Sequence, residues 1–79
     1  MARIPLHMPK FGMTMTEGTI VEWMAEVGDV LKQGAPLLSV ETEKVVTDIE
    51  SPVDGTLVER LFEVDAEVPV GEIIAYIEQ

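Results

Sequence analysis

The sequence predicts an all-β domain in which two short sheets face each other. The first observation is an internal repeat: a shift of 37 positions aligns residues 17–41 with residues 54–78, and eight of these 25 pairs are identical. The second is that short runs of β-branched and apolar residues are interrupted at close intervals by glycine, aspartate and proline, which is typical of sandwiches and barrels. The third is that these interruptions break every stretch long enough for a stable helix. Because only two copies are present, we expect a closed pseudo-twofold domain rather than a solenoid, which needs at least three.

Four strands are expected in the first half of the chain. An apolar run near 3–8 is ended by a proline, and a longer run near 18–26 stops before Gly28. A very short strand near 30–31 and a longer one near 36–42 are separated by a stretch that contains glycine. Each of these runs is short and bounded by turn-forming residues, as expected for strands.

The second half is expected to repeat this pattern. A strand near 45–50 is ended by a Ser-Pro pair, and the run near 55–63 is the copy of the one near 18–26. A very short strand near 67–69 and a last strand near 72–78 correspond to the third and fourth strands of the first half. Alternate residues of both copies would then be buried between the two sheets.

The composition excludes several classes of function. Fifteen acidic residues against five basic ones give a formal charge of −10, which would repel a nucleic-acid backbone. No apolar run is long enough to span a membrane, and the start of the chain lacks the apolar segment of a signal peptide. A chain of 79 residues buries too little apolar surface to line a deep pocket as well as a core. We therefore expect no nucleic-acid partner, no membrane partner, no metal site and no active site of the domain's own.

The segment that joins the two copies is predicted to form a hairpin. Inward-facing residues pair on one apolar or β-branched face when position 42 lies opposite 45, 40 opposite 47 and 38 opposite 49. This register leaves Glu43 and Lys44 as a two-residue turn. Such turns favour Asn-Gly or Asp-Gly because they need positive φ angles. A conflict between local preference and position marks a candidate functional site.

Lys44 is the chemically distinctive residue of this turn. It is one of only three lysines, and the acidic residues around it favour its charged form. A lysine nucleophile needs a desolvated pocket instead, so the position offers access to another protein rather than catalysis. From the spacing alone, Lys44 is either such an accessible amine or an ordinary solvated surface lysine.

The segment 41–55, ETEKVVTDIESPVDG, resembles the lipoylation segment of lipoyl domains in the dihydrolipoamide acyltransferases of 2-oxo acid dehydrogenase complexes. The opening segment 8–18, MPKFGMTMTEG, is similar to the first strand and following loop of the same family. Gly28 lies sixteen residues before Lys44 and Gly55 eleven after it, a spacing that the family also keeps, and both glycines are expected in structural turns. The resemblance covers residues 4–77.

This resemblance implies a barrel-sandwich hybrid of two four-stranded sheets, with lipoic acid in amide linkage to Lys44. It implies a carrier that shuttles acyl groups and reducing equivalents between active sites, the cofactor supplying the chemistry and the protein its presentation. The implied partners are a lipoate ligase or lipoyl transferase, a thiamine-diphosphate-dependent decarboxylase, an acyltransferase core and the flavoprotein dihydrolipoamide dehydrogenase. Residues 1–79 would be a single, monomeric, cytoplasmic domain at the N-terminal end of a longer acyltransferase.

Two other functions stay open. A biotinyl carrier shares the fold and the lysine, but it usually has methionines on both sides, where Glu43 and Val45 stand here. The chain could also be a binding module without a covalent cofactor, which is a different class of function. The internal repeat alone would be sufficient for such a module. The 2-oxo acid or acetoin complex that the chain serves is not specified by the sequence.

The remaining candidates are assigned to recognition or to structure. We expect a ligase or partner that binds Lys44 to contact two further groups of residues. The first group, beside the lysine, is Glu41, Glu43 and Val45, and the second, in the loop between the first two strands, is Phe11, Met13 and Met15. That apolar loop is either a partner surface or folded over the core. His7 lacks companions for a triad or a metal site, and Trp23, whose repeat partner is Arg60, is expected to be half-exposed. A solvated acidic face is expected from Glu22, Glu26, Glu59, Glu63 and Asp65.

Overall fold

A computed structural model describes residues 2–10, 15–42 and 45–79 of the chain. These residues form eight strands, and their order agrees with the order predicted from the sequence. The strands are β1 (Arg3–His7), β2 (Glu17–Trp23), β3 (Val30–Leu31), β4 (Pro36–Glu41), β5 (Val46–Glu50), β6 (Gly55–Arg60), β7 (Glu67–Pro69) and β8 (Ile73–Glu78). The part of the chain that is described contains no helix with the length and hydropathy needed to cross a bilayer.

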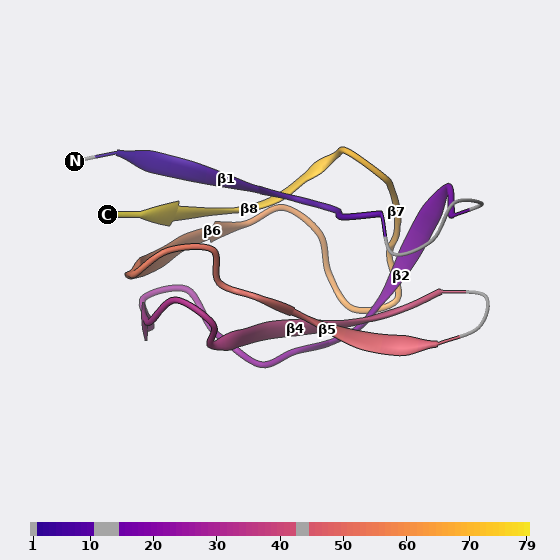
Figure 1. Cartoon of the computed structure of the whole chain (residues 1–79), viewed down its shortest axis with the longest axis horizontal. Coiled ribbons are helices and arrows are strands. Elements are labelled where there is room, and N and C mark those ends of the chain that lie inside the picture. Colours follow the sequence, from indigo (N-terminus) through magenta and orange to yellow (C-terminus); the bar gives the residue numbers. More distant parts are fainter. Residues whose placement is uncertain (1, 11–14, 43–44) are drawn as a thin grey trace.

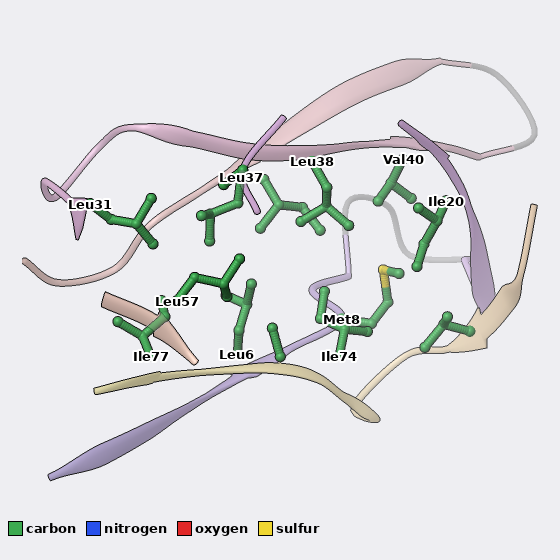
Figure 2. Packing of buried hydrophobic residues seen from close by; sticks show 14 residues of the cluster. Leu6, Met8, Ile20, Leu31, Leu37, Leu38, Val40, Leu57, Ile74 and Ile77 are labelled. Atoms are coloured by element: carbon green, nitrogen blue, oxygen red, sulfur yellow. The ribbon is translucent and has the colours of Figure 1, made fainter. Parts of the chain in front are cut away.

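The strands form two antiparallel four-stranded sheets. One has the order β1-β8-β6-β3 and the other β5-β4-β2-β7; we call them the terminal sheet and the hairpin sheet. Their inner faces enclose the core, to which β4 contributes Leu37 and Val40 from one side and β8 contributes Ile74 and Ile77 from the other (Figure 2). None of these four side chains is exposed to solvent. The prediction of two facing sheets is confirmed.

The two sheets are related by the sequence repeat. A shift of 37 positions carries β2, β3 and β4 onto β6, β7 and β8, and a shift of 43 carries β1 onto β5, so the strand order of one sheet becomes that of the other. The irregularities repeat as well. The register of β2 with β4 shifts between Ile20 and Glu22, and that of β6 with β8 shifts between Leu57 and Glu59. The predicted pseudo-twofold symmetry therefore extends to the β-bulges.

The long strands end earlier than the sequence predicted. The strand expected over 18–26 ends at Trp23, because the amides of both Met24 and Ala25 donate to the carbonyl oxygen of Leu37 and the chain leaves the sheet there. The strand expected over 55–63 ends at Arg60 for the equivalent reason, a bond from Leu61 N to Ile74 O. Apolar character continues past the ladder in both copies, so composition alone did not reveal either end.

The turns that follow are also equivalent. Gly28 has φ 101° and its repeat partner Asp65 has φ 75°. The amide of Gly28 donates to Leu57 O, and that of Asp65 to Ile20 O, each at 2.7 Å. Glycine tolerates this backbone region freely and aspartate is among the few other residues that do, which explains how the two halves keep one turn with different residues.

The molecule is elongated, with extents of 36 × 20 × 19 Å. Both chain ends lie at one end of its long axis, and the β4–β5 hairpin reaches the opposite end (Figure 1). One end of the molecule thus carries both chain termini and the other carries a hairpin, although the strands that lead to the two ends are related by the repeat.

Candidate functional site

The β4–β5 hairpin has the register that the sequence predicted. Leu38 lies opposite Ile49 and Val40 opposite Thr47. The amide of Thr42 then donates to Val45 O at 2.8 Å. We call Thr42 and Val45 the closing pair. Only positions 43 and 44 connect them.

Burial falls steadily along the hairpin. Leu38 and Val40 are fully buried and Ile49 is 5% exposed, whereas Val45 is 53% exposed. The closing pair therefore lies beyond the core, at the end of the molecule opposite both termini (Figure 1). Glu43 and Lys44, the residues at the centre of the site prediction, lie outside the described residues. The site is defined here by the hairpin that leads to them.

Side-chain hydrogen bonds reinforce this hairpin. Thr42 Oγ1 donates to Val45 O at 3.2 Å, in addition to the backbone bond to the same oxygen. Further from the tip, Ser39 Oγ donates to Asp48 Oδ1 at 2.7 Å across the two strands. The sequence predicted Thr42 only as an inward-facing residue, and the hydrogen bond of its hydroxyl was not expected. The available signal was a threonine at the closing position of a turn whose two central residues are unsuited to it.

The hairpin sheet is uniformly acidic. Its four strands contain six carboxylates and no lysine or arginine, namely Glu17, Glu22, Glu41, Asp48, Glu50 and Glu67. The strands of the terminal sheet contain two of each sign, Arg3 and Arg60 against Glu59 and Glu78. The crowding affects ionisation, because the pKa of Glu17 is raised by the hydrogen bond that its protonated carboxyl donates to Glu67 and by the negative charge of Glu67. An amine carried by this sheet is surrounded by charges that favour its protonated form, which suits presentation rather than base catalysis.

The predicted recognition residues are only partly brought together. Glu41 is exposed at the end of β4, next to the closing pair, and Val45 belongs to that pair. Met15 is partly buried and packs against the core, so this one residue has the core-packing role of the two that were expected. Phe11 and Met13 lie outside the described residues, so the expectation for them stays a prediction.

The two glycines expected in turns differ in their roles. Gly28 occupies a turn with positive φ, where an added Cβ would meet nothing within 4 Å. Gly55 instead is the first residue of β6, and a Cβ there would lie 2.6 Å from the carbonyl oxygen of Glu78. Position 28 therefore favours glycine because of its positive φ, and position 55 because a side chain would collide with the backbone of β8.

The remaining candidates are structural. His7 is exposed, with Nδ1 2.9 Å from Gly71 O, and within the described ranges no three ligating side chains gather into a metal site. Trp23 is partly buried as predicted and donates from Nε1 to Phe62 O at 3.0 Å. The expected acidic face is mostly solvated, since Glu22, Glu26, Glu63 and Asp65 are exposed and Glu59 is half-buried.

Comparison with known proteins places this geometry in a family. The family model Biotin_lipoyl, described as "Biotin-requiring enzyme", matches residues 4–77. The dihydrolipoyllysine-residue acetyltransferase component of the pyruvate dehydrogenase complex of Corynebacterium glutamicum is 49% identical over 76 residues, which cover 96% of this chain and 11% of that protein. The corresponding component of the acetoin cleaving system of Pseudomonas putida is 38% identical over 72 residues, 91% of this chain and 20% of that protein. The chain therefore spans a fifth or less of these relatives.

Solved structures show the same fold. The lipoyl domain of the 2-oxoglutarate dehydrogenase complex of Azotobacter vinelandii superposes with a TM-score of 0.79 at 25% identity, and the match covers 96% of both chains. The urea carboxylase of Kluyveromyces lactis superposes with a TM-score of 0.83 at 19% identity, over 99% of this chain and 6% of that one. This second likeness concerns the fold alone.

Proposed function

From the premise that the chain belongs to the biotin- and lipoyl-attachment family, we propose that it is a lipoyl carrier domain whose cofactor is bound as an amide to Lys44. The observation that supports this most directly is the hairpin end. Thr42 and Val45 form a hydrogen-bonded pair beyond the core, at the end of the molecule opposite both termini, and in the sequence only Glu43 and Lys44 separate them. An amine at that position is accessible to a modifying enzyme and, once modified, to successive active sites.

The residues of the hairpin fit a covalently attached group that must remain mobile. The closing pair is bonded through backbone and side chain, and among the described residues Val45 and Val46 beside it are more than half exposed. Lipoic acid supplies the redox and acyl-transfer chemistry when bound. The protein provides the rigid hairpin, while tethering gives a high effective concentration at each active site.

The partners follow from this role. The two curated relatives are acetyltransferase components of a pyruvate dehydrogenase complex and of an acetoin cleaving system. We extend that setting to this chain as the carrier domain of a longer acyltransferase. Its partners are then a lipoate ligase or lipoyl transferase, a thiamine-diphosphate-dependent decarboxylase, the acyltransferase core and dihydrolipoamide dehydrogenase. The domain itself acts as a carrier and not as a catalyst.

Modification by a lipoate ligase tests the proposal. The unmodified domain, incubated with ligase, ATP and lipoate, should gain the mass of one lipoyl group. Lys44→Arg should gain none, while the matched variants Lys10→Arg and Lys32→Arg, which change the two other lysines, should be modified like the wild type. Because each adduct removes one positive charge, the product should also migrate as a more acidic species on a native gel. An adduct mapped to Lys10 or Lys32 would contradict the assignment.

The biotinyl alternative is supported by one observation, the description "Biotin-requiring enzyme" of the matching family model. The same assay with biotin and a biotin ligase separates the two cofactors. We expect no biotin uptake, because the methionines that usually flank a biotinyl lysine are replaced here by Glu43 and Val45.

A further inference from the structure

The lysine turn has a sequence that does not favour a tight hairpin. A two-residue connection needs backbone conformations that Asn-Gly and Asp-Gly adopt readily, and positions 43 and 44 are glutamate and lysine. The preference for closure must therefore come from residues outside the turn.

Thr42 provides two bonds to one acceptor. Its amide lies 2.8 Å and its hydroxyl oxygen 3.2 Å from the carbonyl oxygen of Val45. Thr42 is half-buried while Val45 is exposed, so the donor side is held by packing and the acceptor side faces solvent. The hydroxyl thus restrains the exposed strand at the point where it leaves the turn.

The pseudo-symmetry provides an internal comparison. The repeat carries Thr42 onto Gln79 and Val45 onto Ala2, and the amide of Gln79 donates to Ala2 O at 2.9 Å. The backbone bond is therefore common to both ends of the molecule. Between Gln79 and Ala2, both within the described part of the chain, no side-chain bond supplements it. Of these two equivalent pairs, only Thr42 and Val45 have the additional side-chain bond. The strand pairing itself therefore does not depend on such a bond.

We infer that Thr42 is a positioning residue for modification of Lys44, its hydroxyl helping to hold Thr42 and Val45 in the bonded pairing that a lipoate ligase binds. This inference rests on the proposed function. A ligase that binds only the closed turn has an apparent affinity reduced by the fraction of molecules in which the turn is open. Loss of the hydroxyl should then raise the KM of the ligase for the domain and leave kcat unchanged.

Steady-state kinetics with the unmodified domain as the varied substrate test the inference. Thr42→Val removes the hydroxyl at nearly constant shape, and Thr42→Ala is a second variant without a hydroxyl. Thr42→Ser retains the donor. Thr47→Val is the matched control, since it makes the same chemical change on β5 at a side chain for which no hydrogen bond is described. The variants without the Thr42 hydroxyl should raise KM by about 2- to 10-fold, the range expected for one exposed hydrogen bond, while Thr42→Ser and Thr47→Val stay within about 2-fold of the wild type.

A second measurement reports on the turn without the ligase. Amide hydrogen exchange at Thr42, followed by NMR, should accelerate in Thr42→Val and not in Thr47→Val, with the thermal unfolding temperatures of all variants close to that of the wild type. A wild-type KM for Thr42→Val, an equal defect in Thr42→Ser, or a fall in kcat at constant KM would each overturn the positioning role. If the wild type itself accepts no lipoyl group, the proposed function fails; a modified wild type with an unaffected Thr42→Val removes only this inference.

Discussion

The guanidinium carbon of Arg60 lies 5.3 Å from the centroid of the Trp23 indole ring, and these two residues occupy the same position in the two halves of the chain. Residues that are exchanged by a twofold rotation and also touch each other must lie beside the rotation axis. The contact therefore locates the pseudo-twofold axis. It also replaces a symmetric pair by a cation on an aromatic ring, so the repeat has diverged at a place where a residue meets its own counterpart.

Arg60→Met should lower the free energy of unfolding by about 0.5–1 kcal/mol, because it keeps the aliphatic stem but removes the cation from the ring. Trp23 is the only tryptophan, so its emission should change in this variant. The matched control is Arg3→Met, which removes the cation over Tyr76 at 5.2 Å and should leave the Trp23 emission as it is. Urea unfolding and fluorescence spectra provide both readouts, and unchanged emission in Arg60→Met would contradict the contact.

Two equivalent glycines should respond differently to alanine. A Cβ at Gly18 would lie 2.5 Å from Cγ1 of Val40, whereas a Cβ at Gly55 would lie 2.6 Å from the backbone oxygen of Glu78. Each substitution should cost about 1–3 kcal/mol through overpacking, with Gly55→Ala the more severe because a backbone atom cannot move aside.

A double-mutant cycle separates the two cases. Val40→Ala should offset part of the cost of Gly18→Ala, since it removes the methyl group in the way. Ile77→Ala should leave the contact between position 55 and Glu78 O unrelieved. If the losses in unfolding free energy caused by Gly18→Ala and Val40→Ala simply add in the double variant, the Val40 side chain is not what opposes the added Cβ. The strand that carries position 18 would then move instead.

Glu17→Gln should stabilise the domain at neutral pH. The pKa of Glu17 is raised above its ordinary value of 4.5 by Glu67, so the folded chain binds this proton more tightly than the unfolded chain. Wild-type stability therefore falls as the pH rises through the interval from 4.5 to the raised value. The unfolding temperature of Glu17→Gln should exceed that of the wild type at pH 7, and the gap should close below pH 4.5. Glu22→Gln, which removes the same charge from the same strand, controls for net charge and should show a smaller gap.

Replacing Glu43 and Val45 together by methionine should weaken lipoylation and permit some biotinylation. A ligase that accepts methionine neighbours would have to bury the Glu43 carboxylate without a partner, which costs about 1–3 kcal/mol. The fold should persist, because Val45 is already more than half exposed. Intact mass after incubation with each ligase measures the outcome. If the double variant and the wild type are lipoylated equally and neither takes up biotin, selectivity lies elsewhere, with the loop around Phe11 to Met15 the next candidate.

The fold could be predicted because each half of the sequence carries the same pattern of strands and turns. The 37-residue repeat, the order of the strands and the register of the β4–β5 hairpin all follow from short-range patterns of apolar residues and breakers. Strict alternation failed at the bulge between Pro36 and Leu38, where Leu37 and Leu38 are both fully buried. A bulge changes which face a residue occupies, and no residue type at this point announces one.

The hairpin that leads to the proposed site was predictable, but its side-chain hydrogen bonds were not. The tip lysine follows from the hairpin register, while the Thr42 hydroxyl bond depends on how one strand packs beneath it. The stacking of Arg60 on Trp23 was out of reach for a different reason. It depends on where the symmetry axis passes, and that is a property of the assembled sheets rather than of either half.

The bond from Gln79 N to Ala2 O is the repeat counterpart of the bond from Thr42 N to Val45 O. The β4–β5 pair and the β8–β1 pair are thus equivalent, and each ends in one backbone bond between equivalent residues. Reconnecting positions 79 and 2 and cutting elsewhere would, in topological terms, give a circular permutant with the same sheets. Because the ends of β1 and β8 lie at the opposite end of the molecule from the β4–β5 hairpin (Figure 1), such a permutation would leave the β4–β5 hairpin unbroken.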